Sequence, residues 1–346
     1  MHMLPDDSPR DRPRRRTSAP LGVLFAVVVA VAGAAGVIAA AERQVGNIDR
    51  IENLDDVLAA VEGPAVNYLL IGSDSRAGSD PSSADAGNIG SEADVSGRRS
   101  DTIMILRQEA NGEGAALLSL NRDLWVTHAD TGREQRINAA YNRGADVLAA
   151  TITQEYGIPI NHVVDADFLG FKNIVDTIGG TTVCFDVPAR DIKSGLDQEA
   201  GCNLLTGEQA LAYARSRNYE EFRDGEWRKD GTADIGRVAR QQQFISAAAN
   251  ETLEELKSDP FLASELVGAA SGSLRLDPNL DPLMAAGNLR EAFGAGLVTF
   301  VLPSDGANID GKSVLILRDG PEAQTILAYF RGDGPLPAPP TTTSDG

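Results

Sequence analysis

The sequence is poor in histidine, cysteine and positive charge, and each shortage excludes a class of function. Three histidines far apart (His2, His128 and His162) do not make a histidine-rich metal centre or a multi-histidine proton relay. Two cysteines with no histidine nearby give little support to a catalytic thiol. The 346 residues include 31 basic and 50 acidic ones, a net charge of −19. This balance argues against sequence-independent binding of nucleic acid, which requires a basic face against phosphate.

One long apolar run stands near the start of the chain. Residues 21–41 carry no charge, and as a helix they would be about 31 Å long, enough to cross the hydrocarbon core of a membrane. Five arginines precede this run: Arg10, Arg12, Arg14, Arg15 and Arg16. The basic flank predicts a single-pass type II protein of the cell membrane, with the C-terminal part outside the cytoplasm. A signal peptide cleaved at Ala39-Ala40-Ala41 is the alternative, but the run is longer than a typical signal core.

Composition divides the chain into five segments. Residues 1–20 form a basic cytoplasmic tail, 21–41 a transmembrane helix, 42–62 a juxtamembrane helix, 63–331 one extracytoplasmic domain, and 332–346 a disordered Pro/Thr-rich tail. The helix over 42–62 is predicted from the spacing of its apolar residues, which include Ile48, Ile51 and Leu54.

Strand-like and helical patterns alternate through the predicted domain. Strands are predicted at 66–71, 102–106, 115–120, 163–164, 181–187, 297–302 and 314–317. Helices are predicted at 137–156, 168–178, 206–214, 234–256, 259–270, 280–293 and 322–330. Residues 72–98 and 218–233 are predicted to be loops. The alternation predicts an α/β fold, a layered α/β/α domain with a central mixed β-sheet flanked by helices.

Aspartate and arginine recur where the predicted strands begin or end. Asp74 follows the first strand, Arg99 and Asp101 open the second, and Arg122 and Asp123 follow the third. Strand ends are where α/β folds place their ligand sites. For any one of these residues alone, a solvated turn remains the simpler interpretation.

A second group of polar residues belongs to the predicted helices. Asp234, Arg237 and Gln241 are spaced to share one side of the helix over 234–256. Arg215 and Arg217 stand two residues apart, so their planar guanidinium groups could hold one polyanion together. An ordinary charged helix surface is the alternative.

Seven strings of residues, in order, resemble the LytR-CpsA-Psr family of membrane-anchored cell-wall enzymes. The resemblance covers about 66–250 and rests on these strings: LLIGSDSR (69–76), RRSDTIMIL (98–106), LLSLNRDLWV (117–126), RINAAYNRGAD (136–146), DADFLGFKNIVDTIGG (165–180), LTGEQALAYARSR (205–217) and DIGRVARQQQF (234–244). Seven ordered blocks are far more specific than a single glycine motif.

The resemblance implies an enzyme that builds the cell wall. Family members move a glycopolymer from a polyprenyl-pyrophosphate carrier onto a muramic acid hydroxyl of peptidoglycan, form a phosphodiester link and release polyprenyl phosphate. The implied partners of this chain are therefore a lipid-linked glycopolymer, peptidoglycan and the membrane, with no nucleic acid. Separately from the resemblance, the few lysines and the abundant alanine and glycine are typical of a GC-rich genome, and on this ground arabinogalactan or a related wall polysaccharide is the expected glycopolymer.

The resemblance also implies roles for individual residues. Asp74 and Asp101 match aspartates that bind Mg²⁺, for which Mn²⁺ could substitute. The diphosphate would be held by Arg99, Arg122, Arg136, Arg237 and Gln241, with Asp234 orienting the arginines. The reaction itself is assigned to Arg215, Arg217, Asp101 and Asp123. Either Asp101 or Asp123 could act as general base, and this choice stays open.

The residue types suit this chemistry independently of the resemblance. Phosphoryl transfer needs positioning and charge neutralisation more than covalent help from the protein. Arginine stays protonated and offers bidentate contacts, and Mg²⁺ prefers carboxylate and phosphate oxygens. An apolar set could line a pocket for the prenyl chain or simply form core: Phe168, Leu169, Phe171, Ile174, Val175, Leu211 and Phe244.

Two departures from the family pattern stand out. Asn121 occupies a position where the family often has proline, which is expected to change only the local turn. The loops over 77–97 and 218–233 are long, so their arrangement around the site cannot be carried over from the family.

The two cysteines are expected to pair. Cys184 and Cys202 would lie in an exported domain, where disulfides form and persist. The bridge would enclose 17 residues and contribute around 3 kcal/mol in the chain-entropy model. Two free thiols are the alternative.

Three other functions are alternatives to glycopolymer transfer. A pyrophosphatase would use the same arginines and metal on the lipid-linked glycan, with water as the acceptor. A non-catalytic glycopolymer-binding anchor would need the basic pocket without turnover. A transcriptional regulator is disfavoured by the charge of −19 and by the lack of a basic helix-turn-helix pattern.

Overall fold

A computed structural model describes residues 48–73, 100–109, 114–231, 233–258, 274–281 and 294–338, and the isolated positions 268–269, 284–285, 288 and 292. The predicted basic tail and membrane span (1–41) and most of the predicted helices at 259–270 and 280–293 lie outside the described residues. Among the described residues, no helix is both long enough and apolar enough to cross a membrane.

A seven-stranded mixed sheet forms the centre of the fold. In sheet order its strands are β1 (Asp49–Arg50), β14 (Leu274–Leu276), β7 (His162–Ala166), β2 (Val66–Ser73), β3 (Ser100–Gln108), β4 (Ala115–Leu120) and β15 (Leu297–Val301). β2 runs parallel to β7 and β4 parallel to β15, whereas β3 is antiparallel to both β2 and β4. The prediction of an α/β domain with a mixed central sheet is confirmed.

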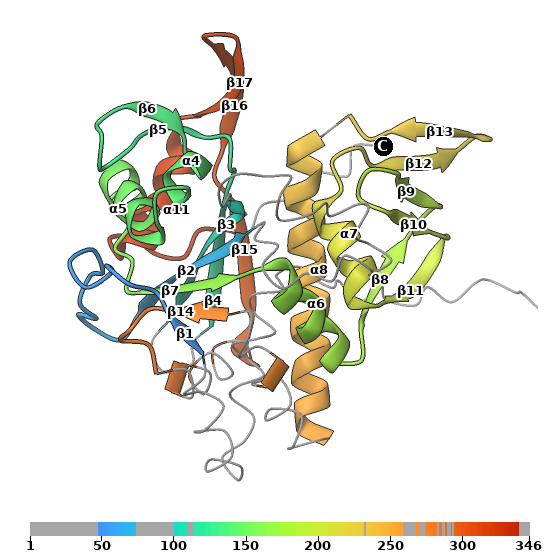
Figure 1. Ribbon diagram of the computed structural model, residues 1–346, viewed down its shortest axis with the longest axis horizontal. Helices are drawn as coiled ribbons and strands as arrows, with labels where there is room; N and C mark the ends of the chain where they lie inside the picture. The colour runs from blue at the N-terminus through green and yellow to red at the C-terminus, as the bar shows by residue number, and fades with distance from the viewer. Residues whose placement is uncertain are drawn as a thin grey trace, which may run out of the picture.

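Helices cover both faces of this sheet (Figure 1). One side carries α4 (Asn138–Tyr141), α5 (Ala145–Tyr156) and α11 (Pro321–Arg331); the other carries α6 (Phe168–Thr177), α7 (Gly207–Arg215) and α8 (Ala233–Ser258). Side chains alternate between the faces with the period of two that a strand imposes. Leu69 and Ile71 belong to the apolar core beneath α5 and α11, whereas Leu70 belongs to the core beneath α6, α7 and α8.

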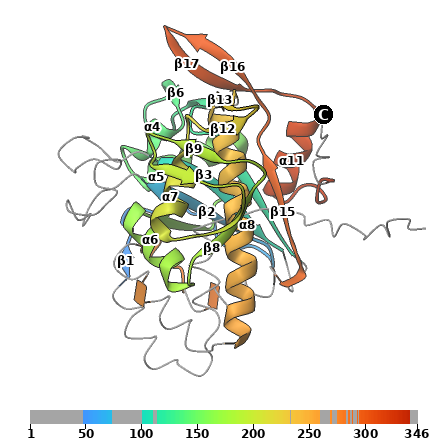
Figure 2. The same cartoon turned by 90° about the vertical axis from the view of Figure 1, so that its right-hand side faces the viewer.

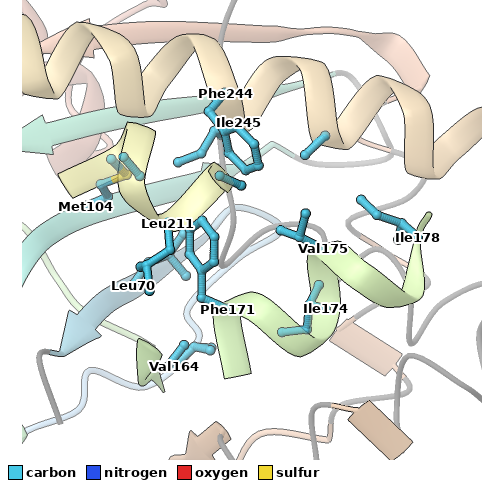
Figure 3. Packing of buried hydrophobic residues seen from close by; sticks show 14 of the residues in the cluster. Leu70, Met104, Val164, Phe171, Ile174, Val175, Ile178, Leu211, Phe244 and Ile245 are labelled. Carbon is cyan, nitrogen blue, oxygen red and sulfur yellow. The ribbon is translucent and has the colours of Figure 1, made fainter. Parts of the chain in front are cut away.

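Five of the seven apolar residues considered for a lipid pocket lie in the core beneath α6, α7 and α8, and the other two, Phe168 and Leu169, are half-buried. Figure 3 shows Phe171, Ile174, Val175, Leu211 and Phe244 converging from these three helices toward β2. The rings of Phe171 and Phe244 stack with their centroids 5.8 Å apart. In this structure these five residues are core, the simpler of the two interpretations.

Smaller sheets and hairpins complete the fold. A four-stranded sheet lies on the α7 side, with β10 (Leu196–Gln198), β9 (Ala189–Asp191), β12 (Glu220–Arg223) and β13 (Glu226–Lys229) in that order. The hairpins are β8 (Thr181–Phe185) with β11 (Gly201–Leu205), β5 (Trp125–Thr127) with β6 (Glu134–Arg136), and β16 (Ser304–Ile309) with β17 (Lys312–Leu317). The last of these projects from the body of the molecule in both orthogonal views (Figures 1 and 2).

Three predicted elements differ from the structure. The described part of the 42–62 helix is instead β1 followed by turns. The three-residue spacing of Ile48, Ile51 and Leu54 arises because the chain passes the edge of the sheet: Ile48 enters one core, and Ile51 and Leu54 enter the other. The predicted helix 137–156 is two helices, because Gly144 between them has a φ of 150°, which favours glycine.

The third difference is the predicted charged loop 218–233, which forms the hairpin β12–β13. Its turn is Asp224-Gly225, both with positive φ, and Phe222 pairs with Trp227 across the two strands. An Asp-Gly turn between two short strands is a sequence signal for a hairpin.

Two local predictions are confirmed. Cys184 and Cys202 form a disulfide across the paired strands β8 and β11. Thr206 caps α7 and forms a capping box with Gln209.

Candidate functional site

The candidate site lies where β2 and β4 end and β3 begins. Ser73, the last residue of β2, is the register partner of Ser100, the first residue of β3, and Ile103 is the partner of Leu120 at the end of β4. The register of β2 and β3 shifts between Gly72 and Ser73. A Cβ at Gly72 would lie 2.9 Å from the Cβ of Thr102, so this close approach requires glycine.

Three candidate residues lie next to these strand ends in the sequence: Asp74, Arg99 and Asp101. Asp74 and Arg99 lie outside the described residues, and Asp101 is described only as part of the β3 backbone. Ser73 and Ser100 are 2% and 0% exposed, and the Ser100 hydroxyl has no hydrogen-bond partner among the described residues. A buried hydroxyl without a hydrogen bond costs folding free energy. A further polar group is therefore expected beside Ser100.

Asp123 connects two of the predicted diphosphate-binding arginines. Its carboxylate lies 3.6 Å from Nε of Arg122 and 3.3 Å from Nε of Arg136. Arg136 also donates from Nη2 to the carbonyl of Ser313 in β17, at 2.6 Å. The structure therefore places Arg122, Asp123 and Arg136 together, between the end of β4 and the hairpin β16–β17.

Asn121 organises the turn that leads to this cluster. It is 3% exposed, and its side-chain oxygen accepts a hydrogen bond from the backbone N–H of Asp123 at 3.3 Å. An asparagine can close such a turn through its side chain. The departure at Asn121 thus has the local role that the sequence predicted.

A turn after α7 holds the other pair of arginines. Arg215 is the last residue of α7, and its guanidinium carbon lies 4.7 Å from the centroid of the Phe168 ring. The Ser216 hydroxyl and the backbone N–H groups of Arg217 and Asn218 all donate to one carboxylate oxygen of Asp191, at 2.8–2.9 Å. Asp191 therefore fixes the backbone from which Arg217 projects, and sequence reasoning did not identify it.

The pKa of Asp191 reflects these contacts. Burial alone raises the pKa, but the hydrogen bonds from Asn218, Ser216, Lys193 and Arg217 outweigh it and lower the pKa below its ordinary value of 3.8. Asp191 is 1% exposed and is thus a buried, ionised anchor at neutral pH.

The first half of α8 packs against the turn after α7. Arg237 is 1% exposed, and Gln241 donates from Nε2 to the carbonyl of Ala214 at 3.0 Å. Arg240, which was not among the predicted site residues, donates to the carbonyl of Ser216 at 2.9 Å and to Asp230 at 3.0 Å. Gln241 therefore contacts the end of α7, and Arg237 lies one helical turn earlier on α8. The side chain of Asp234 lies outside the described residues.

A hydrogen bond connects α8 to β4, the strand that precedes Arg122. Gln242 donates from Nε2 to the Ser119 hydroxyl in β4 at 2.8 Å. The α7–α8 cluster (Arg215, Arg217, Arg237 and Gln241) therefore lies on one side of the sheet, near the end of β4.

His128 supports the backbone of Arg136. Its Nε2 donates to the Arg136 carbonyl at 3.0 Å, and its Nδ1 accepts from Arg143. Burial, together with the nearby Arg143 charge, outweighs the opposing hydrogen bond and Asp130 and lowers the pKa of His128 below its usual 6.5. A neutral imidazole with the proton on Nε2 satisfies both contacts.

A third polar cluster, also missed by sequence reasoning, lies on the opposite side of the sheet from α7 and α8. The Tyr141 hydroxyl donates to Oδ2 of Asp165 at 2.6 Å, and Nη2 of Arg275 contacts both of these groups. Tyr141 and Asp165 are 3% and 2% exposed. Burial raises the pKa of Tyr141 strongly, and the adjacent Asp165 charge raises it further. Asp165 falls within the string DADF, which was the available signal.

Among the described residues, no group of three or more His, Cys, Asp or Glu side chains is arranged to hold a metal ion. The side chains of the predicted ligands Asp74 and Asp101 lie outside the described part of the chain.

Known proteins resemble this chain along most of its length. The LytR_cpsA_psr family profile matches residues 36–327. The "Probable cell wall biosynthesis protein LcpB" of Corynebacterium glutamicum is 32% identical over 268 residues, which are 77% of this chain and 61% of LcpB. The "Polyisoprenyl-teichoic acid--peptidoglycan teichoic acid transferase TagU" of Enterococcus faecalis is 31% identical over 209 residues, which are 60% of this chain and 64% of TagU. The chain thus spans less than two thirds of the length of these relatives.

Solved structures share the fold. The "LytR-Csp2A-Psr enzyme from Actinomyces oris" superposes with a TM-score of 0.62 at 23% identity, covering 82% of this chain and 95% of that one. The structure "TagT bound to LI-WTA" gives a TM-score of 0.59 at 18% identity, covering 83% and 98%. With the family profile matching from residue 36 to 327, this chain belongs to the LytR_cpsA_psr family.

Proposed function

We propose that this protein is a Mg²⁺-dependent phosphotransferase that moves a glycopolymer from a polyprenyl-pyrophosphate carrier onto peptidoglycan. The observation that carries this proposal is the gathering of arginines at one end of the sheet, in a chain whose net charge is −19. Arg122 follows β4 and pairs through Asp123 with Arg136 of β6. Arg215 ends α7, Arg217 lies in the turn after α7, and Arg237 belongs to α8. A local basic site in an acidic protein suits a polyanionic ligand. The name of TagU supports a transferase, and the name of LcpB supports a role in cell-wall biosynthesis.

The arginines would bind the diphosphate and stabilise charge as the transferred phosphoryl group changes partners. Each guanidinium keeps its charge and offers planar donors that match phosphate oxygens. Asp123 has a positioning role here, because its carboxylate lies between Arg122 and Arg136. Asp191 has a similar role for the backbone at Arg217. Preorganised donors of this kind stabilise a transition state without reorganising during the reaction.

Asp74 and Asp101 are the proposed ligands of Mg²⁺, and Mn²⁺ is expected to substitute. Carboxylate oxygens are the donors that Mg²⁺ prefers, and the residues before these aspartates, Ser73 and Ser100, are paired across β2 and β3. The metal would supply charge neutralisation on the diphosphate oxygens.

The acceptor hydroxyl requires a base. Asp101 and Asp123 are the two candidates. Asp101 is also a proposed Mg²⁺ ligand, and Asp123 forms ion pairs with Arg122 and Arg136. Each therefore has a second role, and Asp101→Asn and Asp123→Asn are to be compared side by side.

The proposed cellular setting follows from the apolar segment 21–41. It would anchor the protein in the cell membrane as a single-pass type II protein, with the catalytic domain outside the cytoplasm and close to the lipid-linked donor. Arabinogalactan is the proposed glycopolymer.

One reaction separates this function from the alternatives. The full-length protein in detergent is incubated with a polyprenyl-pyrophosphoryl glycan, with and without peptidoglycan and with Mg²⁺ or chelator. Transfer of label to peptidoglycan with release of polyprenyl phosphate supports the proposal. Release that is indifferent to peptidoglycan would instead identify a pyrophosphatase, and binding without release would identify a non-catalytic anchor.

A further inference from the structure

A pocket of about 420 Å³ opens on the α4–α5 side of the sheet, apart from the α7–α8 cluster. Its polar lining includes Arg50, Glu52, Asn142, Arg143, Asp146 and Arg275. The volume falls within the range of small-molecule binding sites. None of these residues belongs to the proposed diphosphate site.

Hydrogen bonds to neighbouring residues hold the three arginines of this pocket in place. Arg50 donates from Nη1 to the carbonyls of Asp277 and Leu280 at 2.8 and 2.9 Å. Arg143 donates from Nη2 to Asp130 at 2.7 Å, and Arg275 uses Nη2 for Asp165 and Tyr141. Within the described part of the chain, these contacts leave Nε and Nη1 of Arg275 for a ligand. A preorganised donor loses less freedom on binding.

The pocket adjoins the strand end at which the reaction is proposed. Tyr141 lines it, and the Tyr141 hydroxyl interacts with both Asp165 and Ser73. Ser73 is the last residue of β2, next to the proposed metal-binding segment. A ligand bound here would therefore approach that strand end from the side of the sheet opposite to the arginines of α7 and α8.

The charges of the lining indicate the chemistry of the ligand. Three guanidinium groups are accompanied by the carboxylates of Glu52 and Asp146, so the lining carries nearly balanced charge. The carboxylates would repel a diphosphate, whereas a sugar hydroxyl can accept from a guanidinium and donate to a carboxylate at once. The lining thus fits a sugar better than a second polyanion.

We infer that this pocket binds a sugar unit of the acceptor glycan strand and brings its hydroxyl to the end of β2. The inference rests on the proposed function, since it assigns the acceptor half of that reaction. Donor and acceptor would then reach the same strand end from opposite faces of the sheet.

The test uses variants that change the pocket with little cost to the fold. Asn142 is exposed with an ordinary helical φ of −59°, so Asn142→Trp fills the pocket without backbone strain. Glu52→Ala removes an exposed carboxylate, and Arg275→Lys keeps the charge beside Asp165 but removes the planar fork. Gln154→Trp, at an exposed position of α5 outside the pocket, is the matched control.

Two measurements are made on the full-length protein in detergent: co-sedimentation with insoluble peptidoglycan, and transfer rate against peptidoglycan concentration. We expect Asn142→Trp and Arg275→Lys to weaken co-sedimentation and raise the KM for peptidoglycan by about tenfold or more, and Glu52→Ala to do so by a smaller factor. Gln154→Trp should match the wild type, and thermal melts identify any variant that has not folded.

The outcomes separate the two proposals. Wild-type co-sedimentation and KM in folded Asn142→Trp and Glu52→Ala variants would overturn the pocket assignment while leaving transferase activity intact. If the wild type transfers nothing, the proposed function fails, and co-sedimentation still decides whether the pocket binds the glycan.

Discussion

Asp191 illustrates how one buried carboxylate can position a proposed catalytic side chain, that of Arg217, through the backbone. It accepts hydrogen bonds from the Ser216 hydroxyl and from two backbone N–H groups of the turn at Arg217. We expect Asp191→Ala to destabilise the protein by about 2–4 kcal/mol, because one buried and two half-buried donors lose their charged acceptor. Thermal unfolding measures this loss. A melting temperature unchanged from the wild type would show that the turn holds its shape by other means.

The lowered pKa of Asp191 gives this stabilisation a defined pH dependence. The folded-state pKa lies below the ordinary value of 3.8, so the unfolded state binds more protons near that pH. The contribution of Asp191 is therefore complete above that value and is lost as the pH falls through the folded-state pKa. The melting temperatures of wild type and Asp191→Asn should differ by a constant amount between about pH 5 and 8, and the difference should shrink only under more acidic conditions.

Arg215 tests whether planar geometry or charge alone is needed at the α7 turn. Arg215→Lys keeps one positive charge but loses the fork that can bind two phosphate oxygens. We expect the transfer rate to fall about 10²–10³-fold, as for loss of one preorganised donor, with little change in melting temperature. Arg228→Lys, an exposed position in β13, is the control. Equal rates in both variants would remove Arg215 from the chemistry.

At the residue scale, the sequence indicates candidate residues with distinctive chemistry but not the residues that hold them in place. Arg215 and Arg217 could be chosen from their spacing, which suits a polyanion, and Arg237 and Gln241 from the family resemblance. Asp191 could not, since its partners Ser216 and Asn218 lie 25 and 27 residues away, and no local pattern records a contact across such a distance. Arg275 was missed for the same reason, because Asp165 is 110 residues away from it.

Among the elements, the β8–β11 hairpin is the one closed by a covalent bond. The Cys184–Cys202 disulfide joins directly paired strands. Replacing both cysteines with alanine should lower the melting temperature by roughly 5–10 °C, because the unfolded chain regains the freedom of the closed loop. Transfer activity should remain close to that of the wild type. A large loss of activity with an unchanged melting temperature would instead assign the bond a role in the site.

Sequence patterns predict an element well when only one type of local structure produces the pattern. The capping box of α7 and the apolar strands β2, β3 and β4 are of this kind. Residues 48–54 show the opposite case. Their apolar spacing resembles that of a helix, but it arises because the chain passes from one core to the other. Residues 224–225 carried the Asp-Gly turn signal, but the surrounding charges favoured a loop.

For the whole molecule, the order of the strands could not be read from the sequence. β7 and β14 are neighbours although more than 100 residues separate them, and β1 completes that edge through β14. Such pairings depend on which apolar faces meet in three dimensions, and a list of strands does not contain that information. The α/β class itself follows from the alternation of strands and helices, and it is confirmed.

The two apolar cores on either side of the sheet have a consequence for how the protein opens to solvent. Amides of β3, such as those of Ile103 and Ile105, lie in an inner strand with cores on both faces, so their hydrogens should exchange with deuterium only when the whole domain unfolds. The β16–β17 arm extends from the body, and amides near its turn at Asp310-Gly311 should exchange through small local openings. Hydrogen–deuterium exchange followed by mass spectrometry should separate the two rates by at least about 10³-fold.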